Sequence, residues 1–221
     1  MQTRHRIIAI LLSCAVAGIS GVAVATLLFR PKPVNENAGA GISPAALSNL
    51  DEGGLPTLFP TPAFALVDQS DKPITHETLR GKPWIADFIF THCAGPCPMM
   101  TAKMAQLQKD LPGDTVKLVS FSVDPERDRP EVLKTYADRF KADASRWHFL
   151  TTADGEVQPI FDVAAGMKLA AIGATENDPI LHSEKFLLVD ATGNVRGVYS
   201  SSDEQSMSKL VADASRLAKG E

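Results

Sequence analysis

The sequence predicts an α/β fold, with a mixed sheet flanked by helices, for the larger part of this 221-residue chain. A short apolar run at 84–90 precedes a segment with apolar residues at helical spacing, and a second apolar run follows at 116–123. A strand, a helix and a strand in this order favour parallel pairing. Near the C-terminus, the runs 186–189 and 195–199 flank turn-forming residues and predict an antiparallel hairpin at the sheet edge, followed by a helix over 204–217.

The other elements complete this α/β layout. Segments 63–67 and 73–74 flank a polar turn and predict a small hairpin, and 76–79 follows as a short turn or helix. Amphipathic patterns predict helices over 130–142 and 156–165. Predicted helices thus precede and follow predicted strands along the sequence.

The first 30 residues have the composition of a membrane anchor. Residues 7–29 form an uncharged apolar run of 23, long enough to cross a bilayer as a helix. A cleaved signal peptide is the alternative, since the run is rich in small residues, but its apolar core is longer than a typical secretory one. Cys14 faintly matches a lipoprotein cleavage box, although the apolar run continues well past it. We expect 1–30 to form a single-pass transmembrane helix.

The rest of the chain divides into a linker and a domain. Residues 31–57 are rich in Pro, Gly, Ala and Asn and predict a flexible linker before a domain at 58–221. The first 32 residues hold four Lys or Arg and no acid, which leaves 18 basic and 26 acidic residues elsewhere, a formal charge of −8. This charge does not suggest a nucleic-acid surface.

Two cysteines lie at the predicted strand-to-helix junction, in a C-x-x-x-C-P arrangement. Cys93 and Cys97 follow the 84–90 strand, and Pro96 and Pro98 suit a first helical turn because that turn does not need their missing N–H groups. The positive end of a helix stabilises a thiolate, so we expect lowered cysteine pKa values and reactive sulfurs. Four residues apart, the sulfurs can form a disulfide bond or bind one soft metal ion. Two inert structural cysteines are the simpler alternative.

A charged loop at 124–130 follows the 116–123 strand. If that strand is parallel to 84–90, the loop lies at the same edge of the sheet as Cys93. Ligand sites in open α/β sheets favour this edge. Asp124 and Arg127 are therefore candidates for shaping the site, although a solvated charged loop explains them equally well.

A mixed sheet with a cysteine pair at the first strand-to-helix turn and a C-terminal hairpin and helix is a thioredoxin-like layout. Within it, the segments FTHCAGPCP, SFSVDPERDRPEVLKTYADRF and LHSEKFLLVDATGNVRGVY resemble the Sco/SenC family over about residues 58 to 217. These are membrane-anchored, thioredoxin-fold copper chaperones that help build the binuclear copper centre of cytochrome c oxidase.

The resemblance implies a copper site formed by Cys93, Cys97 and His182, with one Cu(I) or Cu(II) per domain. Thiolate suits Cu(I), and imidazole suits both oxidation states. The implied client is cytochrome c oxidase subunit II, with a copper donor protein and a thiol reductant as further partners. The short charged N-terminus favours a bacterial inner membrane, with the C-terminal domain facing the periplasm or outside.

The sequence departs from the family in two places. Many members have Asp immediately before the histidine, whereas Leu181 stands here, so Asp124 or Glu184 would have to orient the imidazole. The segment Ala94-Gly95-Pro96 between the cysteines is unusual and is similar to the Gly-Pro pair of thioredoxin.

A different class of function uses the same residues. In a thiol-disulfide oxidoreductase, Cys93 would attack a disulfide of an exported client and Cys97 would resolve the mixed disulfide. We expect a metallochaperone, with the oxidoreductase as the alternative, and the two functions can coexist if the protein reduces its client before metallating it. A copper sensor or antioxidant protein is a third possibility. Further candidate copper ligands are His92 and the thioethers of Met99, Met100 and Met104, whereas His5, His76 and His148 have no partners at metal spacing.

Overall fold

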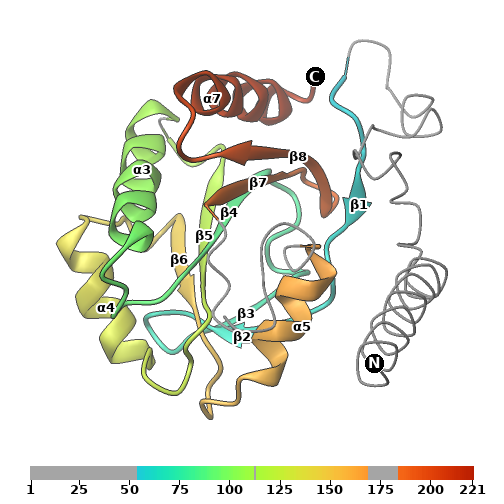
Figure 1. Ribbon diagram of the computed structural model, residues 1–221. Helices are drawn as coiled ribbons and strands as arrows, with labels where there is room; N and C mark the ends of the chain where they lie inside the picture. The colour runs from blue at the N-terminus through green and yellow to red at the C-terminus, as the bar shows by residue number, and fades with distance from the viewer. Residues whose placement is uncertain (1–53, 112, 169–183) are drawn as a thin grey trace, which may run out of the picture. The chain divides into compact units, whose positions relative to one another are not determined.

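A six-stranded sheet forms the centre of the fold (Figure 1). The structure is a computed structural model that describes residues 54–111, 113–168 and 184–221. The strands of the sheet are β1 (Phe59–Pro60), β4 (Trp84–Ile89), β5 (Lys117–Ser122), β6 (Trp147–Leu150), β7 (Lys185–Val189) and β8 (Asn194–Ser200). Their order across the sheet is β1-β8-β7-β4-β5-β6.

The sheet is mixed, as the sequence predicts. Strand β4 pairs in parallel with β5, and β5 with β6, whereas β4 and β7 are antiparallel. Strands β7 and β8 form the predicted antiparallel hairpin. A separate two-stranded sheet joins β2 (Ala65–Val67) to β3 (Pro73–Thr75), which confirms the small N-terminal hairpin.

Four helices are described: α3 (Pro96–Asp110), α4 (Pro130–Arg139), α5 (Gln158–Gly166) and α7 (Glu204–Lys219). Residues of α3, α4 and α7 belong to one apolar core, and residues of α5 belong to another. The two cores lie on opposite faces of the sheet, because successive side chains of β4 alternate between them: Ile85 and Ile89 belong to the first, and Trp84 and Phe88 to the second.

Two features of the sheet differ from the prediction. The hairpin β7–β8 is not at the edge, because Phe59 and Pro60 of β1 pair with β8 through Val195 and Asn194. The opposite edge is β6, which the sequence analysis does not identify. Strand β1 has only two residues and β6 only four, so neither is long enough to show a clear alternation.

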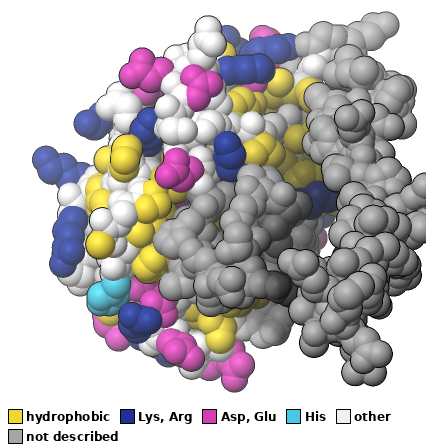
Figure 2. Space-filling view, in the orientation of Figure 1, with side chains coloured by type: hydrophobic (Ala, Val, Ile, Leu, Met, Phe, Trp, Pro, Cys, Tyr) yellow, Lys and Arg dark blue, Asp and Glu magenta, His cyan; other side chains and the backbone are white. Residues whose placement is uncertain are grey.

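Within the ranges that the structure describes, no helix is both long and apolar enough to span a bilayer. The predicted membrane span at 7–29 lies outside those ranges. On the face drawn in Figure 2, Lys and Arg side chains are interspersed with Asp and Glu.

Candidate metal centre

The two predicted site cysteines lie where β4 gives way to α3. Cys93 is in the connecting loop, and Cys97 is in the first turn of α3, directly after Pro96. The loop turns tightly, since the Cys93 N–H donates to the Phe90 carbonyl at 3.3 Å and the Gly95 N–H lies 3.4 Å from Cys93 Sγ. Both thiols are free and buried, with 8% and 4% of Cys93 and Cys97 exposed. The structure thus confirms that the two cysteines share one strand-to-helix junction.

The expected lowering of the cysteine pKa does not hold for Cys97. Burial raises the pKa of the Cys97 thiol well above its ordinary value, the Phe90 backbone offsets part of this rise, and the Cys93 thiol adds to it. The helix start is also a poor anion site, because Pro96 and Pro98 lack the N–H groups that would stabilise a thiolate. A metal ion or a disulfide must therefore displace a bound proton from Cys97.

This pKa predicts slow alkylation of reduced Cys97. In the native protein at pH 8, iodoacetamide should modify Cys97 at least about tenfold more slowly than in the urea-unfolded chain, because the thiolate is the reacting form and the thiol is buried. The native rate should also continue to rise above pH 9. Peptide mapping by mass spectrometry measures both. Equal native and unfolded rates at pH 8 would contradict this assignment.

Buried polar groups lie beneath the junction, on the same face of the sheet as the cysteines. Thr101 Oγ1 donates to the Cys97 carbonyl at 2.9 Å and lies 3.0 Å from the Tyr136 hydroxyl, and burial raises the pKa of Tyr136 to about 12. Asp87 in β4 is completely buried, and this burial raises its pKa to about 7. In the sequence, Asp87 falls within the apolar run 84–90, although one acid in the middle of a buried strand is itself an unusual pattern.

The predicted charged loop does lie beside the cysteine loop. The buried Asp128 carboxylate accepts hydrogen bonds from Thr91 N at 2.9 Å, Thr91 Oγ1 at 2.5 Å and Ser122 Oγ at 2.7 Å. Asp128 therefore joins the ends of β4 and β5. Its partner after β4, Thr91, lies two residues before Cys93. Sequence reasoning missed Asp128, because its pattern does not distinguish it from the exposed acids of the same loop.

Comparison with known proteins agrees with this arrangement. The SCO1/SenC family profile matches residues 57–219, which include both cysteines, the Asp128 loop and His182. The chain belongs to the SCO1/SenC family. A SCO1 protein homolog from Bacillus subtilis is 33% identical over 161 residues, which cover 72% of this chain and 82% of the relative.

Solved structures of SCO1/SenC proteins have the same fold. BsSco, a member of the Sco family of cytochrome c oxidase assembly proteins in which a disulfide switch was identified, is 32% identical, with a TM-score of 0.66. That alignment covers 77% of this chain and 100% of BsSco. Arabidopsis thaliana ScoI, solved with copper bound, is 26% identical, with a TM-score of 0.58 and coverage of 71% and 98%. This SCO1/SenC member therefore has the predicted mixed, thioredoxin-like fold.

The third predicted ligand, His182, lies outside the described residues, together with Leu181. Within the described ranges, no group of three or more His, Cys, Asp or Glu side chains is placed to hold a metal ion. The chemistry of the described donors nevertheless fits copper, because two free thiols lie at one strand-to-helix junction and soft sulfur ligands suit Cu(I). The full predicted set of Cys93, Cys97 and His182 stays a prediction.

Asp124 and Glu184 are the two acids that the sequence suggests as partners of the His182 imidazole. Asp124 Oδ2 lies 3.1 Å from Arg127 Nε, in an ion pair within the loop. Glu184 is exposed.

The other candidate ligands contact other groups, lie in the core or are exposed. His76 contacts the Phe64 backbone and Glu77, and His148 lies 3.3 Å from Asp68. Met100 and Met104 are buried in the core beneath α3, whereas Met99 is 62% exposed. His5 is outside the described residues.

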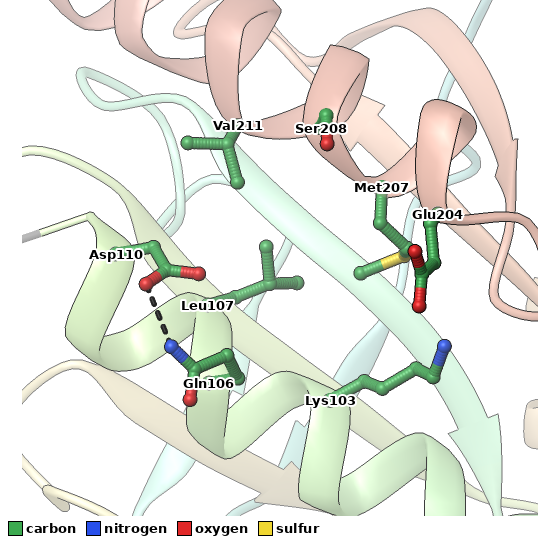
Figure 3. Close-up of a pocket in the computed structure, with 8 residues that line it drawn as sticks. All are labelled: Lys103, Gln106, Leu107, Asp110, Glu204, Met207, Ser208 and Val211. Carbon is green, nitrogen blue, oxygen red and sulfur yellow. Dashed lines mark hydrogen bonds between the residues drawn. The ribbon is translucent and has the colours of Figure 1, made fainter.

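A groove between α3 and α7 is lined by residues that do not belong to the candidate metal centre (Figure 3). Leu107 of α3 lies opposite Met207 and Val211 of α7, and Lys103 and Glu204 lie at one end. Its volume is about 500 Å³. Cys93 and Cys97 do not contribute to its lining. The groove is therefore separate from the candidate metal centre.

Proposed function

We propose that this protein is a membrane-anchored metallochaperone that binds one copper ion through Cys93, Cys97 and His182 and delivers it to the binuclear copper site of cytochrome c oxidase subunit II. The observation that carries this proposal is the pair of free, buried thiols at the β4–α3 junction of a SCO1/SenC chain. Thiolates hold Cu(I), and an imidazole added to them also accommodates Cu(II).

The chemistry of transfer follows from the properties of the two thiols. Copper binding displaces the Cys97 proton, so loading becomes weaker as the pH falls. A disulfide between Cys93 and Cys97 offers no thiolate, so loading also requires a reduced pair and, in an oxidising compartment, a thiol reductant. A copper donor protein supplies the ion, and ligand exchange passes it to subunit II.

The proposed location places this chemistry outside the cytoplasm. The 7–29 run anchors the chain in a bacterial inner membrane as a single-pass helix, and the 31–57 linker lets the 58–221 domain reach its client. The domain faces the periplasm or outside. No nucleic-acid partner is proposed.

Copper binding to the reduced full-length chain, purified in detergent, tests the proposal. We expect one copper per chain in the wild type, a loss of affinity of about 10- to 100-fold or more in His182→Ala, and no tight binding in Cys93→Ser or Cys97→Ser. Competition with a Cu(I) chelator measures the affinity. His76→Ala is the matched control, since His76 contacts the Phe64 backbone and Glu77 instead of the cysteine loop.

A thiol-disulfide oxidoreductase acting on exported clients is the second candidate, favoured by the two free thiols at one strand-to-helix junction. It predicts that His182→Ala and the wild type reduce a disulfide substrate at the same rate. A wild-type chain that holds no copper but shows such activity would replace the chaperone proposal with this one.

A further inference from the structure

In the sequence, His92 lies between Thr91, which contacts Asp128, and Cys93. Its side chain is 59% exposed, and its Nδ1 lies 3.1 Å from Thr91 Oγ1 and 3.9 Å from Asp128 Oδ1. Among the described residues, the hydrogen bond and ion pair of this ring involve Nδ1 alone. The ring is therefore held at one nitrogen and accessible to solvent.

The hydrogen bonds fix which nitrogen carries the proton. Thr91 Oγ1 has a single hydrogen, which it donates to the Asp128 carboxylate at 2.5 Å. Toward His92 this hydroxyl can therefore only accept, so Nδ1 carries the hydrogen of the neutral imidazole. The lone pair is then on Nε2, which has no hydrogen-bond partner within the described residues.

This arrangement is the one that orients a metal-binding histidine. Such a residue donates one ring N–H to a polar group, which fixes the tautomer and makes the other nitrogen a better ligand. Here the polar group is a hydroxyl, and a carboxylate that accepts three hydrogen bonds orients that hydroxyl. The hydrogen bonds from Asp128 through Thr91 to His92 thus prepare an exposed nitrogen ligand on the residue that precedes Cys93 in the sequence.

The accessibility of the cysteines gives this nitrogen a role. Cys93 and Cys97 are only 8% and 4% exposed, so little of either residue is open to a copper donor or acceptor from solvent. Ligand exchange needs an intermediate in which protein and partner share the ion. His92 also lines a surface depression of about 530 Å³ beside α4, together with Thr91, Glu131 and Arg139, which leaves room for a partner's ligand.

We propose that His92 is a transfer ligand, whose Nε2 binds copper while the ion moves between the Cys93–Cys97 pair and a donor or acceptor. This inference rests on the proposed function. In the exchange, a bond from Nε2 to copper forms as one cysteine–copper bond breaks, and the copper keeps its oxidation state. Asp128 and Thr91 are positioning residues, because they act on copper only through His92.

Two measurements on the reduced full-length chain in detergent test the inference. In ¹⁵N-histidine-labelled protein at pH 8, long-range ¹H–¹⁵N correlation should show the Nδ1–H tautomer for His92, with that preference lost in Thr91→Val and kept in Thr91→Ser. In stopped-flow mixing of the Cu(I)-loaded protein with the Cu(I) chelator bicinchoninate, His92→Ala should slow copper transfer at least tenfold. Its equilibrium affinity should change less than threefold.

The other variants separate orientation from a general structural effect. Thr91→Val should slow transfer at least threefold, Thr91→Ser should restore the wild-type rate, and His76→Ala should have no effect. Equal transfer rates in His92→Ala and the wild type, or an Nε2–H tautomer in the wild type, would overturn the inference while leaving copper binding in place. A wild-type chain that holds no copper would instead overturn the proposed function, and the transfer role with it.

Discussion

Replacement of Asp128 by alanine should lower the free energy of unfolding by about 3 kcal/mol. The carboxylate accepts hydrogen bonds from the Thr91 N–H, the Thr91 hydroxyl and the Ser122 hydroxyl, and both Asp128 and Ser122 are fully buried. Its removal takes this acceptor from the buried Ser122 hydroxyl and from two donors of the half-buried Thr91, and each buried donor left unpaired costs about 1–3 kcal/mol. Urea unfolding of the apo protein, followed by circular dichroism, measures the loss.

Asp124→Ala is the matched control in the same loop. The Asp124 carboxylate pairs with the exposed Arg127 side chain, and such a pair contributes less than about 1 kcal/mol. Asp128→Ala should therefore destabilise the protein much more than Asp124→Ala. Similar losses in the two variants would show that the buried hydrogen bonds to Asp128 do not hold the ends of β4 and β5 together.

The central part of the fold could be predicted from the sequence because its strands are mainly apolar. Residues 84–90 and 116–123 predict β4 and β5, and both strands are buried along nearly their whole length. The edge strands β1 and β6 could not be predicted in this way. They are short, and their pairing with β8 and β5 depends on contacts with segments distant in the sequence.

Part of the candidate site could also be predicted, because it depends on patterns that are visible in the sequence. Cysteine spacing and flanking prolines identify Cys93 and Cys97, and parallel pairing places the 124–130 loop beside them. The sequence pattern does not reveal which acid of that loop is buried, because the burial of Asp128 goes with its hydrogen bonds to Thr91 and Ser122. The direction of the Cys97 pKa shift also depends on burial, which is set by the three-dimensional fold.

Asp87 is a carboxylic acid buried in the middle of the sheet. Both of its carboxylate oxygens lack a hydrogen-bond partner within the described part of the chain. Ser120, its register partner in β5, lowers the pKa in part, but no hydrogen bond of normal geometry joins them, and the Ser120 hydroxyl accepts from Trp147 Nε1 at 3.0 Å. Burial dominates, so the pKa of Asp87 rises from 3.8 to about 7.

This shift sets the sign of a pH dependence. Between about pH 4 and pH 7 the folded state holds the Asp87 proton and the unfolded state does not, so the free energy of unfolding falls as the pH rises. A rise in pKa from 3.8 to about 7 corresponds to a loss of roughly 4 kcal/mol, complete above the folded pKa and absent below pH 4. The charge of Asp87 also disfavours a thiolate at Cys97.

Asp87→Asn should remove this pH dependence. The variant is expected to gain roughly 3 kcal/mol relative to the wild type between pH 4.5 and pH 8, because the amide cannot ionise and its own burial cost is the same at every pH. Urea unfolding of both apo proteins at pH 4.5, 6 and 8 measures the difference, in which the titration of all other groups cancels. Parallel curves for the two proteins would mean that Asp87 finds a partner for its charge, and that the sheet beneath the cysteines tolerates an ionised carboxylate.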